Sequence, residues 1–226
     1  MLTIVDYGAG NLRSVTRAFE YLGIPAQVVG CPEAVERAEA VVFPGVGAAG
    51  AAMRHLKEKG LDEAINAALK RGIPFLGVCL GMQLLLSYHE ENNIAGLALL
   101  PGRVRRLPGS VLVPQMGWNQ VTLLRESPLF EGIPPGAHFY FNHSYYADPE
   151  NPEMIAGQTD YGLPFCSVIE AGNLWGVQFH PEKSSVNGLK LLRNFAKVAG
   201  VRERPTGARM AEPGEAKHYG PEAGQC

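Results

Sequence analysis

The sequence predicts a single α/β domain of three layers, in which helices cover both faces of a largely parallel central sheet. Up to about residue 90, short apolar runs of strand length alternate with stretches of helical periodicity. After about residue 95, short β-rich runs separated by turn residues replace that alternation. Strands that alternate with helices pair in parallel, so the first half should form the parallel sheet. The second half should extend the same sheet with antiparallel or mixed strands.

Four short apolar runs in the first half are the predicted parallel strands, with helical stretches between and after them. The first helix illustrates the reasoning, because its apolar residues recur at helical spacing and Gly23 ends the pattern. The strands cover 2–5, 26–29, 40–43 and 74–78, and the helices cover 12–22, 48–60, 61–72 and 80–89.

The second half is predicted to complete the domain, so that residues 1–200 form one unit. Residues 201–226 are rich in Gly, Pro, Glu and Ala and hold almost no apolar residues. Such a segment cannot bury enough surface to offset the entropy of ordering, so we expect a disordered tail. The β-rich runs cover 119–124, 138–147, 165–172 and 174–179, and a closing helix covers 186–200.

Composition and charge argue against several classes of function. A net charge of −2 gives no electrostatic case for binding nucleic acid or an anionic membrane. The four cysteines have no regular spacing, so no metal site is expected. The N-terminus is not that of a signal peptide, and no apolar run approaches the length of a membrane span. A cytoplasmic location with free thiols is the expectation.

The first glycine loop has the position of a dinucleotide-binding fingerprint but not its residues. In "GAGNLR" (8–13), Arg13 stands where the third glycine is needed, and no acidic residue ends the second predicted strand. A tight turn is therefore favoured over NAD binding, and no cofactor is expected. Ligands bind at the carboxyl ends of strands in such sheets, so a site or interface role for the loop stays open.

Cys79 stands between Gly77 and Gly81 at the junction of a predicted strand and helix. This is the pattern of the G-x-S-x-G nucleophile elbow, with cysteine in place of serine. Small neighbours two positions away permit a sharp turn, and a helix N-terminus favours the negative charge of a thiolate. A lone cysteine in an apolar stretch is more often a small core residue. The interpretation as a nucleophile therefore requires a partner base.

His180 is the candidate base among six histidines, because an apolar strand leads directly into it. It should lie at the same sheet edge as Cys79, and Glu182 follows two residues later on the same side of an extended segment. A carboxylate there can fix the tautomer of the imidazole, which favours a Cys-His-Glu triad over a structural turn. By contrast, His55 and His89 have charged neighbours in predicted helices and are expected on the surface.

Acyl transfer also requires hydrogen-bond donors for an oxyanion. The loop "FPGVGAAGAAM" (43–53) follows the third predicted strand, and its glycines leave the backbone bare. One donor is expected around Val46 and Gly47, and the second is the N–H of Leu80, directly after the nucleophile. A plain strand-to-helix connection is the alternative.

Together these pieces resemble the class I, triad-type glutamine amidotransferases over residues 1 to about 200. The resemblance depends on "PGVG" (44–47), "GVCLGMQLL" (77–85) and "GVQFHPEKS" (176–184). A narrower resemblance is to the glutaminase subunits of imidazole glycerol phosphate synthase, from histidine biosynthesis. It depends on "IVDYGAGNLRSV" (4–15), "PQMGWNQV" (114–121) and "FNHSYY" (141–146).

The resemblance implies a flavodoxin-like fold and hydrolysis of L-glutamine through a γ-glutamyl thioester on Cys79. It implies that Gln83 holds the amino-acid end of the substrate, that Ser144 and Tyr145 add backbone contacts, and that Gly47 lies along it. It also implies a heterodimer with the cyclase subunit, a (β/α)8 barrel that receives the ammonia. Two other functions stay open, a standalone cysteine hydrolase such as a peptidase or γ-glutamyl hydrolase, and a non-catalytic binding module.

A docking surface is predicted around the site, because several exposable side chains lie on segments that end at the same sheet edge as Cys79. A Trp, a Tyr, a Met and a Lys on one rim are typical of an interface. Core packing is the alternative for Trp118 and Tyr140. The predicted interface residues are Asn11, Met116, Trp118, Tyr140 and Lys183.

Overall fold

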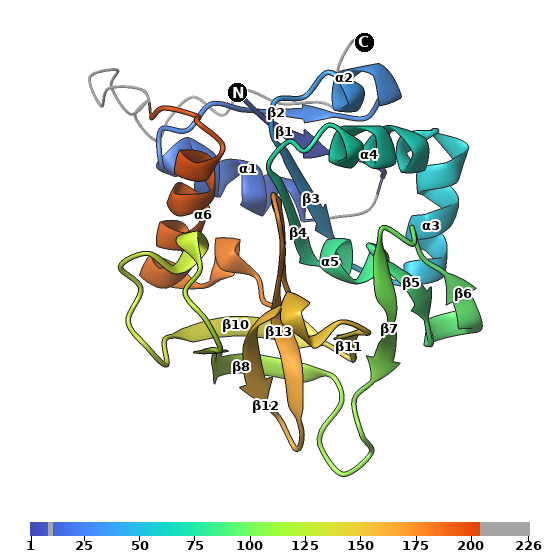
Figure 1. The fold of residues 1–226 in the computed structure, drawn as a ribbon, viewed down its shortest axis with the longest axis vertical. Helices are drawn as coiled ribbons and strands as arrows, with labels where there is room; N and C mark the ends of the chain where they lie inside the picture. The colour runs from blue at the N-terminus through green and yellow to red at the C-terminus, as the bar shows by residue number, and fades with distance from the viewer. Residues whose placement is uncertain (9–10, 204–226) are drawn as a thin grey trace, which may run out of the picture.

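The computed structural model describes residues 1–8 and 11–203 and has the predicted three-layer α/β architecture (Figure 1). Five parallel strands form one half of the main sheet, starting from the edge strand β2, in the order β2-β1-β3-β4-β14. The first four strands along the chain coincide with the four predicted parallel strands, and the fifth lies in the predicted β-rich run 174–179. The five strands are β1 (Leu2–Val5), β2 (Ala26–Val29), β3 (Val41–Gly45), β4 (Phe75–Cys79) and β14 (Leu174–Val177).

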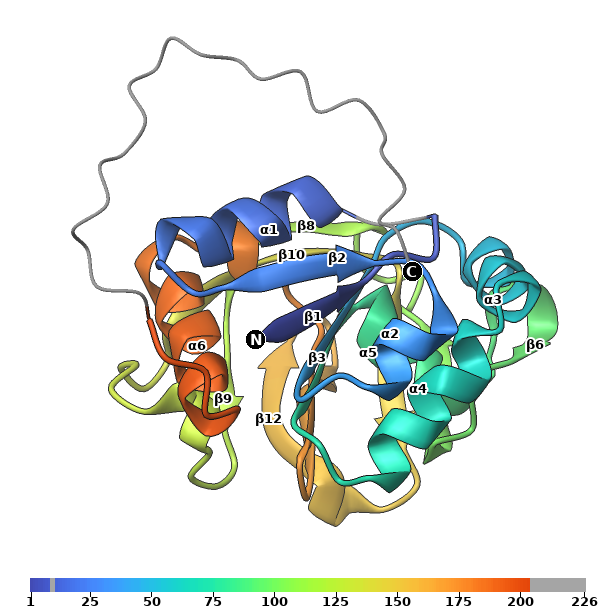
Figure 2. The ribbon, with the colours of Figure 1, turned by 90° about the horizontal axis from the view of Figure 1, so that it is seen from above.

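Helices cover both faces of this parallel sheet (Figure 2). One face carries α1 (Leu12–Tyr21) and α6 (Ser185–Val198), and their apolar sides share one core cluster. The other face carries α2 (Pro32–Glu36), α3 (Ala49–Glu58) and α4 (Leu61–Lys70), which share a second cluster. The predicted helices over 12–22, 48–60, 61–72 and 186–200 are thus confirmed to within two residues at each end, whereas the short α2 was not predicted.

The second half extends the main sheet with mixed strands, as predicted, in the order β14-β13-β11-β7-β5-β6, with β12 attached to β13 and β9 attached to β12. Only β5 and β7 pair in parallel among these neighbours. The strands are β5 (Leu86–His89), β6 (Ile94–Ala95), β7 (Leu100–Arg106), β9 (Thr122–Leu123), β11 (Tyr145–Pro149), β12 (Ile155–Asp160) and β13 (Pro164–Ala171). Short 3-10 turns connect them at Glu91–Asn93, Pro128–Phe130 and Pro152–Met154.

A separate two-stranded antiparallel sheet consists of β8 (Gln115–Gln120) and β10 (His138–His143). The predicted single run over 138–147 is therefore divided at Ser144, and its two parts belong to different sheets. This division places the stretch His143–Tyr145 at the point where the two sheets meet.

The predicted helix over 80–89 is wrong beyond its first five residues. The helix α5 (Leu80–Leu84) ends, and β5 begins at Leu86. The carbonyls of Leu84, Leu85 and Leu86 accept backbone hydrogen bonds from the segment 97–100 instead of from the next helical turn. Every residue from 80 to 86 is buried, so this stretch has no polar face to present to solvent as a helix would.

The predicted boundary of the domain near residue 200 lies close to the end of the described chain. Val201 still packs on the core, and its N–H donates to the carbonyl of Ala196. Glu203 forms an exposed ion pair with Arg193 at 2.7 Å. The rest of the predicted tail, residues 204–226, lies outside the described residues. Of the helices that are described, none is long and apolar enough to cross a membrane.

Candidate active site

Cys79 is the last residue of β4 and directly precedes α5, with φ +54° and ψ −112°. A positive φ is disfavoured for a residue with a side chain and costs on the order of 1–3 kcal/mol, so the surrounding structure must hold it. This backbone is the strained strand-to-helix turn predicted from the sequence. Cys79 is 6% exposed, and it borders a cavity of about 270 Å³.

The two glycines that flank Cys79 are required by close backbone contacts. A Cβ at Gly81 would lie 1.9 Å from the carbonyl oxygen of Phe43 on the neighbouring strand β3. A Cβ at Gly77 would lie 2.9 Å from the backbone of Met82 in α5. Any side chain at either position would push α5 away from the sheet, so the glycines permit the turn that presents Cys79.

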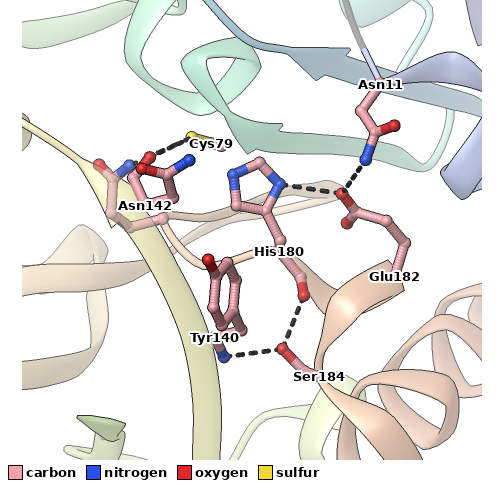
Figure 3. Close-up of polar contacts among 8 residues, drawn as sticks. Asn11, Cys79, Tyr140, Asn142, His180, Glu182 and Ser184 are labelled. Atoms are coloured by element: carbon pink, nitrogen blue, oxygen red, sulfur yellow. Dashed lines mark hydrogen bonds and ion pairs between the residues drawn. The ribbon is translucent and has the colours of Figure 1, made fainter. Parts of the chain in front are cut away.

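His180 and Glu182 follow β14 and form a buried pair. Nδ1 of His180 lies 2.9 Å from Oε1 of Glu182, and their side chains are only 3% and 1% exposed. Pro181 begins a 3-10 turn, Pro181–Lys183, which brings Glu182 back to the imidazole. A carboxylate accepts, so Nδ1 carries the proton and Nε2 is left for the other side. Figure 3 shows the His180 ring between Cys79 and Glu182.

The charges on both sides of His180 favour its protonated form. Burial acts to lower the pKa of His180, but the Cys79 thiolate and the Glu182 carboxylate together outweigh burial and raise that pKa. The arrangement can therefore hold a thiolate and an imidazolium as a pair. Its chemical capacity is nucleophilic attack followed by proton delivery to a leaving group. The catalytic roles of Cys79, His180 and Glu182 stay predictions.

Ser184 positions His180 and was not singled out from the sequence. Its hydroxyl donates to the His180 carbonyl at 2.6 Å and accepts from the N–H of Tyr140 at 2.9 Å (Figure 3). The His180 N–H in turn donates to the carbonyl of Tyr140 at 2.9 Å. These bonds attach the segment after β14 to β10. The sequence offers only a serine four residues after the histidine, and that spacing is not a recognisable pattern by itself.

The predicted oxyanion residues surround the same cavity. Val46, Gly47 and Leu80 all line it, together with Cys79 and His180. Gly47 has φ +94° and no atom within 4 Å of the place where a Cβ would lie, so glycine is needed there for its conformation rather than for space. The loop ends where the N–H of Ala49 donates to Oε2 of Glu91 at 2.7 Å. Their role as donors to an oxyanion stays a prediction.

The predicted substrate-binding residues Gln83, Ser144 and Tyr145 also line this cavity. The side chain of Gln83, however, already makes several hydrogen bonds within the protein. Its Nε2 donates to the carbonyl of Tyr145 at 2.7 Å and to Oε1 of Gln178 at 2.9 Å. Both amide protons are thus used within the protein. Oε1 of Gln83, which faces Nε2 of His89 at 3.2 Å, keeps one further lone pair.

The predicted surface position of His89 is wrong. His89 is 1% exposed at the end of β5, and burial lowers its pKa to about 4. The charged neighbours in the sequence suggested a solvated helix, whereas β5 turns the ring towards Gln83. His55, also expected on the surface, is half-buried on α3.

Four of the five predicted interface residues make contacts that link them to the site or to one another. Trp118 is 53% exposed and meets Tyr140 edge-on, with ring centroids 6.2 Å apart. Nζ of Lys183 lies 5.9 Å above the Tyr140 ring, and Asn11 donates to Glu182. Because about half of Trp118 is exposed, core packing of this residue is excluded. Met116, on the same β8 strand, is 65% exposed.

Within residues 1–8 and 11–203, no group of three or more His, Cys, Asp or Glu side chains is arranged to hold a metal ion. Cys166 is buried, and burial raises the pKa of its thiol. Of the two buried cysteines among the described residues, Cys79 borders the cavity, so the expected chemistry depends on Cys79 and not on Cys166.

Comparisons with known proteins agree with this geometry. A family model of class-I glutamine amidotransferases matches residues 3–199. The imidazole glycerol phosphate synthase subunit HisH of Moorella thermoacetica is 52% identical over 198 residues, which are 87% of this chain and 94% of that protein. The subunit of the same name from Chlorobaculum tepidum is 50% identical over 199 residues, 87% of this chain and 99% of that one. A crystal structure described as a glutamine amidotransferase superposes with a TM-score of 0.70 at 22% identity, covering 88% of this chain and 99% of its own.

Proposed function

The chain belongs to the class-I glutamine amidotransferase family, and we propose that it is the glutaminase subunit of imidazole glycerol phosphate synthase, an enzyme of histidine biosynthesis. Its reaction is the hydrolysis of L-glutamine to glutamate and ammonia. The observation that carries this proposal is the His180 ring, held between Cys79 and Glu182 at the edge of a cavity of about 270 Å³. That volume suits a small amino acid rather than a folded polypeptide.

In the acylation half-reaction, the Cys79 thiolate attacks the side-chain carboxamide carbon of glutamine. The imidazolium of His180 gives its Nε2 proton to the departing nitrogen, so that ammonia leaves and a γ-glutamyl thioester forms. Glu182 keeps the Nδ1 proton in place, which fixes the ring through both steps. His180 is then neutral and takes a proton from the water that attacks the thioester. Glutamate leaves, and the thiolate and the imidazolium are restored.

The charge that develops on the carboxamide oxygen requires donors within the cavity. We assign this role to the N–H groups of Val46, in the loop after β3, and of Leu80, at the start of α5 directly after Cys79. Gly47 lies along the substrate in this arrangement. Removing one such donor in other enzymes costs roughly a hundred- to a thousandfold in turnover, so the placement of these N–H groups is expected to have a large effect on the rate.

The amino-acid end of glutamine is proposed to bind at Gln83, Ser144 and Tyr145. The free lone pair on Gln83 Oε1 suits the α-ammonium group. The Leu107 N–H donates to the Ser144 carbonyl. Because hydrogen-bonded and non-hydrogen-bonded pairs alternate in an antiparallel ladder, the next pair, Tyr145 and Arg106, is not hydrogen-bonded. The Tyr145 N–H therefore points away from β7. That N–H is a suitable donor for the α-carboxylate.

A partner subunit is part of the proposal, because ammonia released into neutral water is mostly protonated and ammonium is not a nucleophile. We propose a heterodimer with the cyclase subunit, a (β/α)8 barrel that uses the ammonia to make imidazole glycerol phosphate and aminoimidazole carboxamide ribotide. The surface around Trp118, Tyr140, Met116, Lys183 and Asn11 is the proposed docking face. A cytoplasmic location suits a biosynthetic subunit with free cysteines.

The test is a glutaminase assay of the chain alone and with the cyclase subunit and its nucleotide ligand. We expect little glutamate from the isolated chain and a large rise when both additions are present. Full glutamine turnover without a partner would favour a standalone cysteine hydrolase. Unaltered function after Cys79→Ala would favour a binding module.

A further inference from the structure

A continuous row of hydrogen bonds, partly buried at Glu91 and buried from His89 onward, connects the start of α3 with the sulfur of Cys79. Glu91 accepts from the Ala49 N–H at 2.7 Å, and the N–H of Glu91 donates to Nδ1 of His89 at 3.0 Å. Nε2 of His89 lies 3.2 Å from Oε1 of Gln83. The row thus begins beside the loop that carries Val46, and three of its members, Glu91, Gln83 and Cys79, line the cavity.

Two glutamine side chains complete the row. Nε2 of Gln83 lies 2.9 Å from Oε1 of Gln178, and Nε2 of Gln178 lies 3.7 Å from Sγ of Cys79. Gln178 is completely buried directly after β14, and Gln83 is 5% exposed. Buried polar groups need their hydrogen bonds, so this row resists rearrangement.

The direction of each bond from His89 to Cys79 follows from two backbone groups of fixed polarity. The N–H of Glu91 can only donate, so Nδ1 of His89 accepts and Nε2 carries the proton. The carbonyl of Tyr145 can only accept, so the atom of Gln83 that faces it at 2.7 Å is Nε2. With Gln83 fixed in this way, Gln178 must turn its oxygen to Gln83 and its N–H to Cys79. Burial lowers the pKa of His89 to about 4, which keeps the ring neutral, as this arrangement requires.

We propose that Gln178 stabilises the Cys79 thiolate through a hydrogen bond from Nε2, and that Gln83 and His89 are positioning residues that fix the direction of this bond. The inference rests on the proposed nucleophilic role of Cys79. The reverse orientation of the Gln178 amide would place its oxygen against the thiolate, which is repulsive. The bond is needed twice in each cycle, because the thiolate is the attacking group in acylation and the leaving group in deacylation.

The experiment measures the rate at which iodoacetamide alkylates Cys79 in the full chain, as a function of pH, with the modified peptide identified by mass spectrometry. Gln178→Met keeps the volume but removes the donor. We expect a roughly tenfold lower alkylation rate at neutral pH, because a hydrogen bond to a charged group is lost, and a higher pH for the half-maximal rate. A change of less than about twofold would overturn the proposal.

Variants of His89 separate the positioning role from general packing. His89→Leu leaves Gln83 without its donor and is expected to shift the alkylation profile in the same direction as Gln178→Met. His89→Gln can accept from Glu91 and donate to Gln83, and is expected to restore most of the wild-type profile. The matched control is Ser87→Ala, which removes a 3.2 Å bond to the Leu100 carbonyl on the same strand but outside the row. Equal shifts in all three variants would contradict the proposal.

A measurement on the unmutated chain covers the case in which Gln178→Met does not fold. The side-chain amide resonance of Gln178 in an NMR spectrum should move when Cys79 is alkylated, and should move more than that of Gln27 on β2. An unchanged Gln178 resonance would overturn the proposal. These measurements use neither glutamine nor the cyclase, so they can fail while glutaminase activity stands. They can also succeed while it is absent.

Discussion

The side-chain amide of Asn11 donates to Oε1 of Glu182 at 3.3 Å, the same oxygen that accepts from Nδ1 of His180 (Figure 3). The first loop of the chain thus reaches the far end of the proposed triad, 171 residues away in sequence. The other carboxylate oxygen, Oε2, is buried with no partner among the described residues. Asn11 therefore helps to fix Oε1 of Glu182, the atom that orients the His180 ring. It also connects the proposed docking face with the site.

We expect glutaminase turnover to fall in a graded order along this line of contacts. His180→Ala removes proton transfer and should lower turnover roughly a thousandfold or more. Glu182→Gln removes orientation and should cost less, and Asn11→Ala should cost about tenfold or less, because it removes one hydrogen bond. Turnover is measured as glutamate release by the complex at equal folded fraction. A more severe loss in Glu182→Gln than in His180→Ala contradicts the assignment of roles.

Much of this site follows from local sequence patterns, and the rest depends on long-range contacts. The elbow at Cys79 could be predicted because Gly77 and Gly81 report a tight turn within five residues. The contacts of Ser184 with Tyr140 and of Gln178 with Gln83 and Cys79 could not, because these partners lie on segments that are distant in sequence and meet only in the folded chain. The predicted helix over 80–89 is wrong for a related reason. The helical periodicity of the sequence continues through Leu86, but the carbonyls of 84–86 accept hydrogen bonds from the N–H groups of 97–100 instead of from a further helical turn.

Gly81→Ala tests whether the elbow depends on the close approach of β3 and α5. The new Cβ would lie 1.9 Å from the Phe43 carbonyl oxygen, so β3 or α5 must move. We expect the free energy of unfolding to fall by at least about 2 kcal/mol, and Cys79 alkylation to lose its selectivity. The matched control is Gly109→Ala, where a Cβ meets nothing within 4 Å and φ is not positive. Similar denaturation midpoints for the two variants would show that the elbow has more room than the structure gives it.

Charge reversal at Lys183 tests the proposed docking face. Its ammonium lies over the ring of Tyr140, which also contacts Trp118, so Lys183→Glu removes this contact and introduces an opposite charge on the rim. We expect roughly tenfold weaker binding of the cyclase, or weaker stimulation of glutaminase activity by its ligand. Lys70→Glu at the end of α4 is the control. If affinity and stimulation are both unchanged in Lys183→Glu, the docking face lies elsewhere.

Stability should decline in mild acid because two buried histidines are held neutral. Burial lowers the pKa of His89 and of His143 to about 4. The unfolded chain therefore binds more protons than the folded one between pH 6.5 and about 4, and stability is lost as the pH falls through this window. For His89 the loss is at most roughly 3 kcal/mol.

Chemical denaturation of wild type and His89→Gln at several pH values measures the contribution of His89. At pH 7 the wild type should have a larger free energy of unfolding than the variant, and this difference should shrink as the pH falls towards 4. His138→Gln on β10, where the side chain is exposed, is the control and should follow the wild-type curve. Parallel curves for wild type and His89→Gln would mean that the ring does not titrate on unfolding.

The central claim is that Cys79 of this chain generates ammonia for a partner. It is tested most directly by measuring imidazole glycerol phosphate synthesis in the complex with the cyclase, once with glutamine and once with an ammonium salt as the nitrogen source. In Cys79→Ala we predict that glutamine-dependent synthesis is abolished and that ammonia-dependent synthesis stays at the wild-type rate. Loss of both activities, or persistence of the glutamine-dependent one, would contradict the account.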